Sequence, residues 1–337
     1  MRDIRDFNLK EYNTFGINAV CRRFIEIEKA DEVTPLVCSL TSDDLPLLII
    51  GGGSNLLLTG NFDGTVLRSA IKGVESSSEG GYVLLRCGSG ETWDDIVRHC
   101  VDHGWYGAEN LSLIPGDVGA TAVQNIGAYG AEVCNLIWSI EAVDMVTGLQ
   151  ETINPRECAY AYRDSRFKHE WKNKYFITAV TYRLSETFEP KLDYGNIRSE
   201  LTRLEIPKPT AAQLRQVIIN IRNAKLPDVK VEGNAGSFFV NPVISREKYL
   251  QLLSDYPQMP HYTIDEEHEK VPAGWLIERC GWKGRSMGNA GVHDKQALVL
   301  VNKGGATGQE VLALSKAIKV DVMARFGIEI QSEVNIV

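Results

Sequence analysis

Two glycine-rich segments constrain the fold of this 337-residue chain more than any other feature. The first runs from Gly51 to Asn55 and directly follows an apolar stretch, Leu45 to Ile50, which predicts a buried strand. Because glycine has no Cβ atom, backbone N–H groups at such a turn can approach an anion closely. Taken alone, the segment is also typical of a tight turn, since it matches neither the dinucleotide-binding pattern G-x-G-x-x-G nor a Gly-Lys-Ser/Thr phosphate loop.

The second segment, from Ile114 to Gly130, is glycine-rich and apolar. It holds four glycines and two amide side chains, Gln124 and Asn125. Such a segment suits hydrogen bonding from the backbone to a diphosphate or to the edge of an isoalloxazine ring. A structural loop with glycine at its turns has the same composition, but two such segments in one chain favour a cofactor site.

Three helices have clear sequence signals at their ends. One is expected from Thr92, a candidate N-cap, to Gly104. Two others begin with a capping box, Thr210 with Gln213 and Thr307 with Glu310. Each helix carries an apolar stripe at helical spacing. The stripes are Ile96, Val97, Cys100 and Val101; Leu214, Val217, Ile218 and Ile221; and Val311, Leu314, Ile318 and Val322.

Strands are expected at residues 23–27 and 82–87, and residues 136–190 alternate like the strands of a mixed sheet. Pro227 prevents the second helix from continuing and marks the start of a C-terminal domain of about a hundred residues. Gly327 is placed to close the last helix, and a strictly alternating strand follows, with Glu333 on its polar face. Its apolar face is formed by Ile328, Ile330, Val334 and Ile336.

Composition indicates an ordinary globular protein, with 44% hydrophobic and 24% charged residues. The net charge of −8 argues against nucleic acid or an anionic membrane as partner. The chain shows no signal peptide and no run long enough for a membrane helix, so we expect a cytoplasmic protein. Its seven scattered cysteines, without a Cys-x-x-Cys pair, predict free and mostly buried thiols and no metal site.

Arg163 is a candidate anion-binding residue because Tyr162 and Asp164 flank it. An arginine held rigid between such neighbours presents a bidentate fork to a carboxylate. A structural salt bridge is the alternative interpretation.

Ser237 lies between Gly236 and two phenylalanines, in a setting that leaves a hydroxyl exposed in an apolar cleft. Because residue 239 is Phe, the Gly-x-Ser-x-Gly elbow of hydrolases is missing. A hydrolase nucleophile is therefore disfavoured, and a hydroxyl that donates a proton stays open as a role for Ser237. His293 is interpreted as a structural histidine, and Lys225 as a surface lysine that could otherwise carry charge for a phosphate.

Taken together and in order, these segments resemble the UDP-N-acetylenolpyruvoylglucosamine reductase family over almost the whole chain. The resemblance rests on six motifs, which are residues 13–17, Gly51 to Asn55, Ile114 to Gly130, Tyr162 to Ser165, Gly233 to Phe239, and Glu333-Val334. A further stretch, Leu192 to Gly195, is similar to the tyrosine loop of the family's type I form. Asn335 stands where the family usually has arginine.

The resemblance implies an α+β fold, in which a two-lobed FAD-binding domain of the vanillyl-alcohol-oxidase (PCMH) type precedes a smaller C-terminal α/β substrate domain. We expect the first FAD-binding lobe at residues 1–72, the second at 73–226, and the substrate-binding domain at 227–337. It further implies a monomer that reduces UDP-N-acetylglucosamine enolpyruvate to UDP-N-acetylmuramate, for peptidoglycan precursor synthesis. Non-covalent FAD would be reduced by NADPH, which leaves before the sugar nucleotide enters the same cleft.

The same resemblance implies the site residues. Arg163 would stabilise negative charge on the substrate carboxylate, Ser237 would donate a proton, and Glu333 would assist as proton relay or polarise the enol. The residues implied for FAD are Gly51, Gly52, Gly53, Ser54, Asn55, Gly116, Gly119, Ala120, Asn125, Gly127 and Tyr162. Those implied for the substrate are Tyr194, Lys225, Asn241, Lys283 and Gln296.

Two other functions compete with this interpretation. An oxidase of the same flavin fold would give no reason for Ser237 between Gly236 and the phenylalanines. A non-catalytic flavoprotein would keep both glycine-rich segments, but it would not need Arg163, Ser237 and Glu333 together.

Overall fold

The computed structural model describes residues 1–337, apart from the side chain of Glu79. The chain forms two compact units. The first unit contains residues 1–7, 21–52 and 63–224, and the second contains residues 8–20, 53–62 and 225–337. Two short N-terminal segments thus belong to the same unit as the C-terminal third of the chain. The expected division of the FAD-binding part at residues 72 and 73 stays a prediction.

The larger sheet of the first unit has five strands in the order β11-β10-β12-β7-β6. Their bounds are β6 Val74–Glu79, β7 Tyr82–Gly88, β10 Ile137–Asp144, β11 Gln150–Ile153 and β12 Tyr175–Ser185. Every neighbouring pair is antiparallel, so the expectation of a mixed sheet over residues 136–190 is wrong. The physical reason is that a parallel return requires a crossover helix, and within the described residues 137–185 no α-helix separates β10, β11 and β12.

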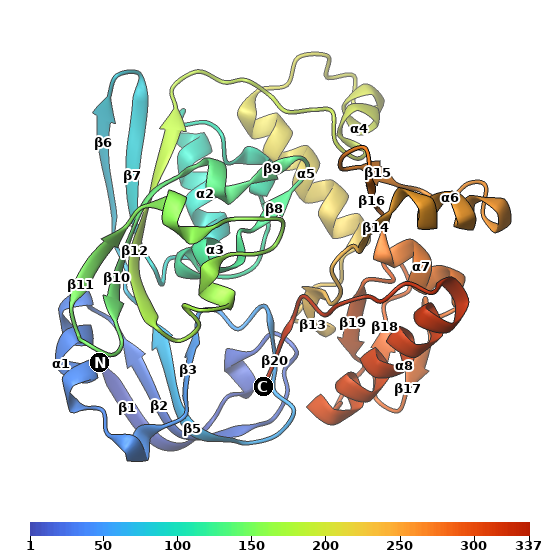
Figure 1. The fold of residues 1–337 in the computed structure, drawn as a ribbon. Helices are drawn as coiled ribbons and strands as arrows, with labels where there is room; N and C mark the ends of the chain where they lie inside the picture. The colour runs from blue at the N-terminus through green and yellow to red at the C-terminus, as the bar shows by residue number, and fades with distance from the viewer. The chain divides into compact units, whose positions relative to one another are not determined.

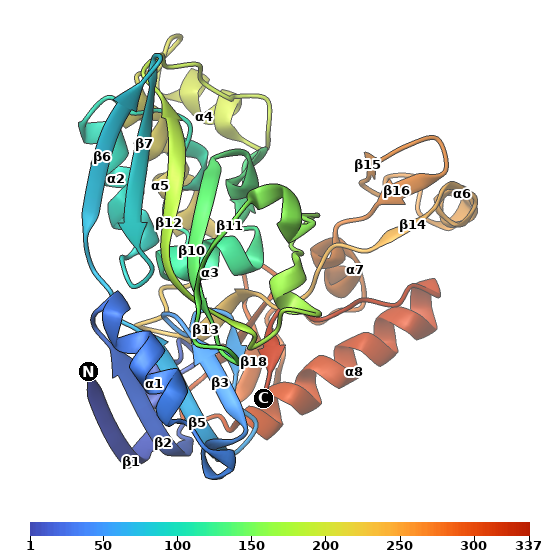
Figure 2. The ribbon, with the colours of Figure 1, turned by 60° about the vertical axis from the view of Figure 1, so that its left-hand side comes forward.

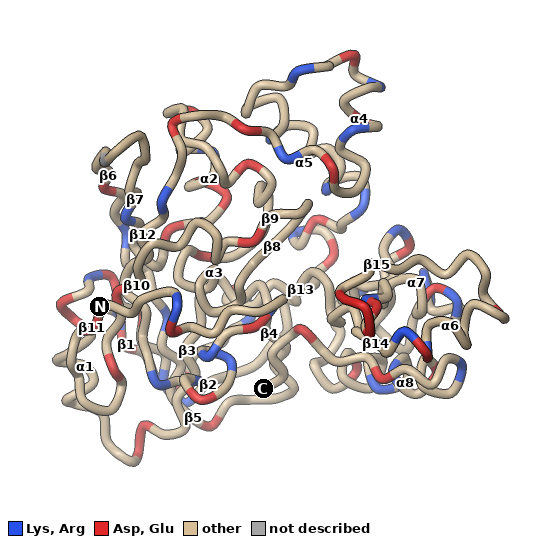
Figure 3. Tube along the Cα trace, turned by 45° about the horizontal axis from the view of Figure 1, so that its top comes forward, with Lys and Arg blue, Asp and Glu red and all other residues tan. Residues whose placement is uncertain are grey.

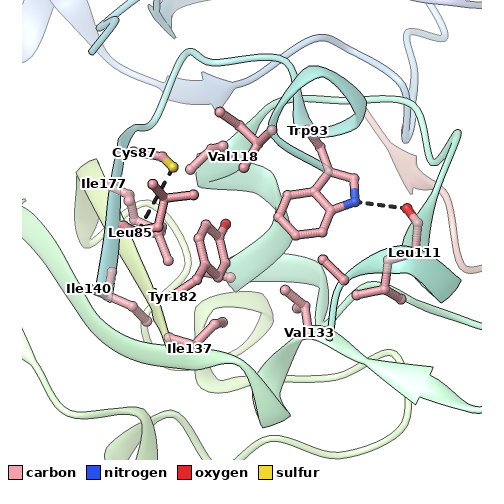
Figure 4. Packing of buried hydrophobic residues seen from close by; sticks show 14 of the residues in the cluster. Leu85, Cys87, Trp93, Leu111, Val118, Val133, Ile137, Ile140, Ile177 and Tyr182 are labelled. Atoms are coloured by element: carbon pink, nitrogen blue, oxygen red, sulfur yellow. Dashed lines mark hydrogen bonds between the residues drawn. The ribbon is translucent and has the colours of Figure 1, made fainter. Parts of the chain in front are cut away.

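Helices α2 (Trp93–Asp102) and α3 (Val118–Gln124) lie on one side of this sheet (Figures 1 and 2) and share its core. Figure 4 shows Trp93 and Tyr182 in the centre of that core, with their ring centroids 5.3 Å apart. Both polar tips are satisfied, since the Trp93 indole donates to the carbonyl of Leu111 at 3.0 Å and the Tyr182 hydroxyl lies 2.7 Å from that of Thr121. Large aromatic residues can therefore fill the core without an unmade hydrogen bond.

The smaller sheet of the first unit has the order β1-β2-β5-β3, and β3 runs parallel to β5. Its strands are β1 Arg2–Asn8, β2 Val20–Ile27, β3 Leu47–Ile50 and β5 Phe62–Ser69, and α1 (Val33–Ser39) packs with it. The strands predicted at residues 23–27 and 82–87 are thus confirmed. The strand expected from Leu45 begins only at Leu47, and Leu45 itself is 55% exposed.

Helices α4 (Ile197–Arg203) and α5 (Ala211–Lys225) form a second small core in the first unit. The capping box of α5 is confirmed, because the Thr210 N–H donates to the Gln213 side chain at 2.9 Å and the Gln213 N–H to the Thr210 hydroxyl at 3.2 Å. Its predicted stripe of Leu214, Val217, Ile218 and Ile221 is buried.

The second unit is built on a four-stranded antiparallel sheet in the order β13-β19-β18-β17. The strands are β13 Gly233–Ser237, β17 Ser286–Met287, β18 Ala290–Val292 and β19 Val299–Asn302, and α8 (Gly308–Phe326) packs on them and on α7 (Ala273–Arg279). A small sheet of β14 (Val243–Ser245), β15 (Tyr262–Thr263) and β16 (His268–Lys270) packs with α6 (Arg246–Asp255). A third pairing joins β4 (Leu56–Leu57) in parallel to β20 (Asn335–Ile336).

The helix expected after Thr307 is confirmed as α8, with its capping box, its buried stripe and a left-handed Gly327 at φ +61°. The helix expected after Thr92 is α2, but the Thr92 side chain makes no capping hydrogen bond. A tertiary contact takes the place of that cap, because the backbone N–H of Trp93, the first residue of α2, donates to the carbonyl of Gly116 at 3.0 Å.

The alternating strand expected at the C-terminal end is only partly formed. Ile328, Ile330 and Val334 are buried as expected, but Ile336 is 40% exposed, and regular pairing covers only β20. The partner strand β4 has just two residues, so it offers too few backbone groups to pair with a longer strand.

Acidic and basic residues are interspersed along the trace of each unit (Figure 3). Many of them form ion pairs, such as Arg86 with Glu141, whose two hydrogen bonds measure 2.6 and 2.7 Å. No helix in the described part of the chain combines the length and the apolar character that a bilayer crossing requires. All seven cysteines are free, as predicted, and four of them are buried.

Candidate active site

The two glycine-rich segments meet within the first unit. A Cβ atom added to Gly52 would lie 3.2 Å from Oδ1 of Asp117 and 3.5 Å from the Cα atom of Gly116. One added to Gly51 would lie 3.5 Å from the Cβ atom of Ala120. The absence of side chains therefore lets the backbone at residues 51 and 52 approach the second segment closely.

Gly53 belongs to the second unit and has a different role. Its φ is +65°, and a Cβ atom there would lie 2.0 Å from the carbonyl oxygen of Tyr12. The backbone N–H of Thr14 also donates to the Gly53 carbonyl at 3.2 Å. Only glycine fits this position, because any side chain would collide with the backbone of residues 12 and 13.

The second segment is more ordered than its composition suggested, because residues 118–124 form α3 and two short strands follow, β8 (Gly127–Ala128) and β9 (Ala131–Glu132). Gly119 packs α3 against Ser89, where an added Cβ atom would lie only 2.9 Å from the Ser89 Cβ. The Gly119 N–H donates to the Ser89 carbonyl at 2.9 Å. Gly116 precedes the helix with φ +121°, a conformation that favours glycine.

Asn125 joins this segment to the loop that carries Arg163. It is buried in a left-handed conformation with φ +43°. Its side chain donates to the carbonyl of Ala161 at 2.8 Å and accepts from the N–H of Cys134 at 3.2 Å. The Asn125 side chain therefore ties the backbone at Ala161 to the backbone at Cys134.

The Arg163 guanidinium is held by backbone carbonyls. It donates to the carbonyl of Asn125 at 3.4 Å and to that of Gly127, and it lies over the Tyr162 ring at 5.2 Å. Asp164 faces His169 instead, at 2.8 Å. The rigid arginine expected from the sequence is present, but carbonyl groups rather than Asp164 orient it.

Two charged groups in the first unit were not expected from the sequence. Asp117 is buried, and Arg222 on α5 has a fully buried Nε atom that finds no hydrogen-bond partner among the residues that the structure describes. Burial lowers the pKa of Arg222; nearby Tyr129 and Asp94 oppose this, and Arg163 adds to it. The available signal for Arg222 was its spacing of four residues from Ile218, which puts it on the buried stripe of α5.

Ser237 ends β13 in the second unit and is half-buried, next to the fully buried rings of Phe238 and Phe239. Gly236 before it has φ +68° and donates its N–H to the Asn234 side chain at 2.9 Å. After it, the Phe238 N–H donates to the Leu298 carbonyl at 2.7 Å. The backbone on both sides of Ser237 is therefore fixed.

Glu333 lies beside this segment in the same unit. Its backbone N–H donates to the Phe238 carbonyl at 2.8 Å, and the Val240 N–H donates to the Gln331 carbonyl at 3.0 Å. The segments that carry Ser237 and Glu333 are thus neighbours, although 96 residues separate them in the sequence. Asn335, at the position of the family's usual arginine, donates its backbone N–H to the Asn55 carbonyl at 3.1 Å.

Three of the residues expected to bind the substrate surround α7 in the second unit. The Asn241 side chain accepts from the Ala273 N–H at 2.9 Å, and Lys283 pairs with Glu278 at 3.1 Å. Oε1 of Gln296 lies where it would be 3.1 Å from a Cβ atom added to Gly274. These three form one group by their contacts with a single helix.

The other two expected substrate residues lie apart from that group. Tyr194 is 42% exposed in the first unit and packs over Gly130, while Lys225 is the exposed last residue of α5. His293, interpreted from the sequence as structural, has its Nδ1 3.1 Å from Glu232, and Glu232 also binds Lys303 at 2.6 Å.

The residues present in the first unit fit a flavin dinucleotide. Gly51 and Gly52 expose backbone without side chains beside Gly116 and Ala120, and the buried Oδ2 atom of Asp117 at the same place has no hydrogen-bond partner in the described part of the chain. Backbone amides of this kind bind phosphate oxygens, and an unpartnered polar atom is satisfied when a polar ligand arrives.

Comparison with known proteins gives the family. The profile described as "UDP-N-acetylenolpyruvoylglucosamine reductase, C-terminal domain" matches residues 226–337, and an FAD binding domain profile matches residues 22–154. The chain is 51% identical over 334 residues to the UDP-N-acetylenolpyruvoylglucosamine reductase of Bacteroides fragilis strain YCH46, which covers 98% of this chain and 99% of that protein. It is 43% identical to the Flavobacterium johnsoniae protein of the same name, over 98% of each chain.

A solved structure shows the same fold. The crystal structure of the reductase from Thermus caldophilus matches with a TM-score of 0.68 at 22% identity, over 99% of this chain and 98% of that one. The expected fold class, α+β with a two-lobed FAD-binding domain and a smaller C-terminal domain, is confirmed. This chain belongs to the UDP-N-acetylenolpyruvoylglucosamine reductase family.

Proposed function

We propose that this FAD-dependent oxidoreductase uses NADPH to reduce UDP-N-acetylglucosamine enolpyruvate to UDP-N-acetylmuramate, a step toward peptidoglycan. The reductase activity named for its relatives supports the reaction. The structural observation that carries the proposal is the backbone hydrogen bond from Glu333 to Phe238, which puts the expected relay acid beside the segment of the expected proton donor, Ser237. A module that only binds flavin has no use for that pairing.

FAD, once reduced and bound, supplies a hydride to the substrate. We propose that Gly51, Gly52, Ser54 and Asn55 of the first segment hold it, together with Gly116 of the second. The remaining residues proposed for this site are Gly53, Gly119, Ala120, Asn125, Gly127 and Tyr162. The close approach of the two segments at Asp117 supports this assignment.

Arg163 is proposed to stabilise the negative charge that develops on the substrate carboxylate during reduction. Its guanidinium is oriented before substrate arrives, because the carbonyls of Asn125 and Gly127 already hold it. A preoriented donor of this kind typically lowers the activation barrier by about 3–4 kcal/mol. Arg222, a second cation on the same unit, adds positive charge nearby.

Ser237 is proposed to donate the proton that completes the reduction, at the inner carbon of the enolpyruvyl group. A serine hydroxyl is a weak acid, so its position matters more than its acidity. The hydrogen bonds at Gly236 and Phe238 fix the backbone that carries it. Glu333 is proposed to assist as proton relay or by polarising the enol.

Tyr194, Lys225, Asn241, Lys283 and Gln296 are proposed to bind the UDP-sugar. Their residue types suit it, since a diphosphate needs cations and amide donors. The contacts of Asn241, Lys283 and Gln296 with α7 support a common role for these three. We further propose that the protein acts in the cytoplasm as a monomer, on a small-molecule substrate and not on nucleic acid.

The two half-reactions test the proposal separately. Purified protein should be yellow or take up FAD, its flavin absorbance should bleach with NADPH, and the enolpyruvyl sugar nucleotide should restore the absorbance. A protein that takes up no FAD would contradict family-type catalysis altogether. A flavin that is reduced by NADPH but not reoxidised by the enolpyruvyl substrate would contradict the proposed substrate alone.

A further inference from the structure

Asp117 is an unusual residue for a diphosphate site. It is 8% exposed, and its Oδ2 atom is fully buried without a hydrogen-bond partner among the described residues. Its two carboxyl oxygens lie 3.2 Å and 3.5 Å from where Cβ atoms of Gly52 and Gly51 would be. A potentially anionic group therefore lies directly against the backbone proposed to hold an anionic ligand.

The described surroundings of Asp117 leave its Oδ2 atom without a hydrogen bond. The first backbone N–H groups of α3 are used elsewhere, since Val118 donates to Glu91 at 2.8 Å and Gly119 to Ser89 at 2.9 Å. The charged groups that act on it are Arg68 of β5, Lys72 after that strand, and Glu91 before α2. Arg68 is paired with Glu26, and Lys72 with Glu91 at 3.4 Å.

Burial dominates these opposing effects. It raises the pKa of Asp117 to about 6, although Arg68 and Lys72 act to lower it and Glu91 acts to raise it. An ionised carboxylate would repel a diphosphate bound beside it, whereas a protonated carboxyl group can donate a hydrogen bond to a phosphate oxygen.

We propose that Asp117 holds the FAD diphosphate in its protonated form, as a hydrogen-bond donor, so that FAD affinity decreases as pH rises. This inference rests on the proposed location of the diphosphate at residues 51–52 and 116. It adds Asp117 to the residues of the second glycine-rich segment that are proposed to hold FAD, and it couples cofactor binding to proton uptake.

The direction of the pH dependence follows from the linkage between proton binding at Asp117 and FAD binding. Below a pH of about 6 the carboxyl group is protonated before and after binding, and affinity is highest. The anionic ligand raises the pKa of Asp117 further, so binding takes up a proton above that pH. The dissociation constant for FAD should then increase by up to about tenfold per pH unit until the pKa of the complex is reached.

The test is titration of flavin-free full-length protein with FAD, followed by flavin fluorescence at several values between about pH 5.5 and pH 8.5. Wild type should bind progressively more weakly as pH rises. Asp117→Asn and Asp117→Ser keep a donor without a charge, so both should bind with little pH dependence, and about tenfold or more tightly than wild type at the highest pH. Two uncharged variants are used so that a folding failure of one leaves the other informative.

Gly52→Ala distinguishes this inference from the proposed location of FAD, because its Cβ atom would press on Asp117 at 3.2 Å. If this variant binds FAD more weakly while wild type and both Asp117 variants share one pH profile, the location stands and the role of Asp117 is overturned. If Gly52→Ala leaves affinity unchanged and wild type shows a flat profile, the proposed location fails as well.

Discussion

The side-chain amide of Asn55 donates a hydrogen bond to the backbone carbonyl of Glu333 at 3.2 Å, across 278 residues of sequence. The same Asn55 accepts from the backbone N–H of Asn335 at 3.1 Å through its own carbonyl. The end of the first glycine-rich segment is thus tied to the segment that carries the proposed relay acid, within one unit. Binding of FAD to that glycine-rich segment is therefore expected to influence the position of Glu333.

Ser237→Ala should leave reduction of the flavin by NADPH near normal and slow its reoxidation by the enolpyruvyl substrate about 100- to 10,000-fold, the usual contribution of a positioned proton donor. Stopped-flow absorbance measures each half-reaction. Ser254→Ala is the matched control, because Ser254 lies on α6 of the same unit and its hydroxyl donates to the Gln251 carbonyl of its own helix at 2.8 Å. Equal slowing of both half-reactions would count against Ser237 as the donor.

Gly127→Ala should displace Arg163, because the added Cβ atom would lie 2.7 Å from Nη1 of Arg163 and 2.9 Å from the Ala131 carbonyl. We expect kcat/KM for the enolpyruvyl substrate to fall by about 100- to 1,000-fold, as for loss of one preoriented donor. Gly60→Ala serves as control, since no described atom lies within 4 Å of its Cβ position. Unchanged kcat/KM in Gly127→Ala would show that the carbonyl-held position of Arg163 is unimportant for catalysis.

Thr210→Ala should lower the free energy of unfolding of the first unit by about 1 kcal/mol, because it removes the capping box of α5. Thr92→Ala in the same unit should cost less than about 0.5 kcal/mol, since Thr92 precedes α2 without a capping hydrogen bond. Urea denaturation measures both. Equal losses would contradict the difference in capping.

Arg215→Met should destabilise the protein by about 3 kcal/mol at neutral pH and by much less near pH 3, as followed by urea denaturation. Burial alone would raise the pKa of Asp94, but hydrogen bonds from Arg215 at 2.7 and 2.9 Å, with the Leu113 N–H, hold it below its usual range. A lowered carboxyl pKa stabilises the fold above the pKa of the unfolded chain, and this contribution is lost as pH falls through the folded value.

The control for Arg215→Met is Arg98→Met, because Arg98 lies on the same helix as Asp94. Arg98 pairs with Asp95 at 2.9 Å, but both side chains are more than half exposed. An exposed pair contributes at most about 1 kcal/mol, so the control should change stability little. A loss in Arg215→Met that is the same at both pH values would show that Asp94 does not provide the linkage.

Cys38 should react first with iodoacetamide in the native protein, since it is the exposed cysteine among the seven. Burial raises the pKa of Cys87 to about 12 and that of Cys158 to about 11, so both should stay unlabelled until the protein is denatured. Mass spectrometry of peptides before and after denaturation measures the order. Labelling of Cys87 as fast as Cys38 would require local opening of the first unit's core.

Sequence patterns predicted the elements whose stability is local. The capping boxes at Thr210 and Thr307, the apolar stripes of α5 and α8 and the left-handed Gly327 all depend on residues within a few positions of one another. Where the interaction partner was distant in sequence, the local pattern was insufficient. Thr92 does not cap α2, and the second glycine-rich segment contains α3.

The amino-acid sequence by itself determined the family, the helices with local caps and the residue types available for chemistry. Tertiary structure decided which of them meet: Asn55 with Glu333, Gly127 with Arg163, and Asp117 with Gly51 and Gly52. The physical reason is that capping and amphipathic spacing act over one or two helical turns, whereas burial of a charge and close backbone approach depend on segments that only the folded chain brings together.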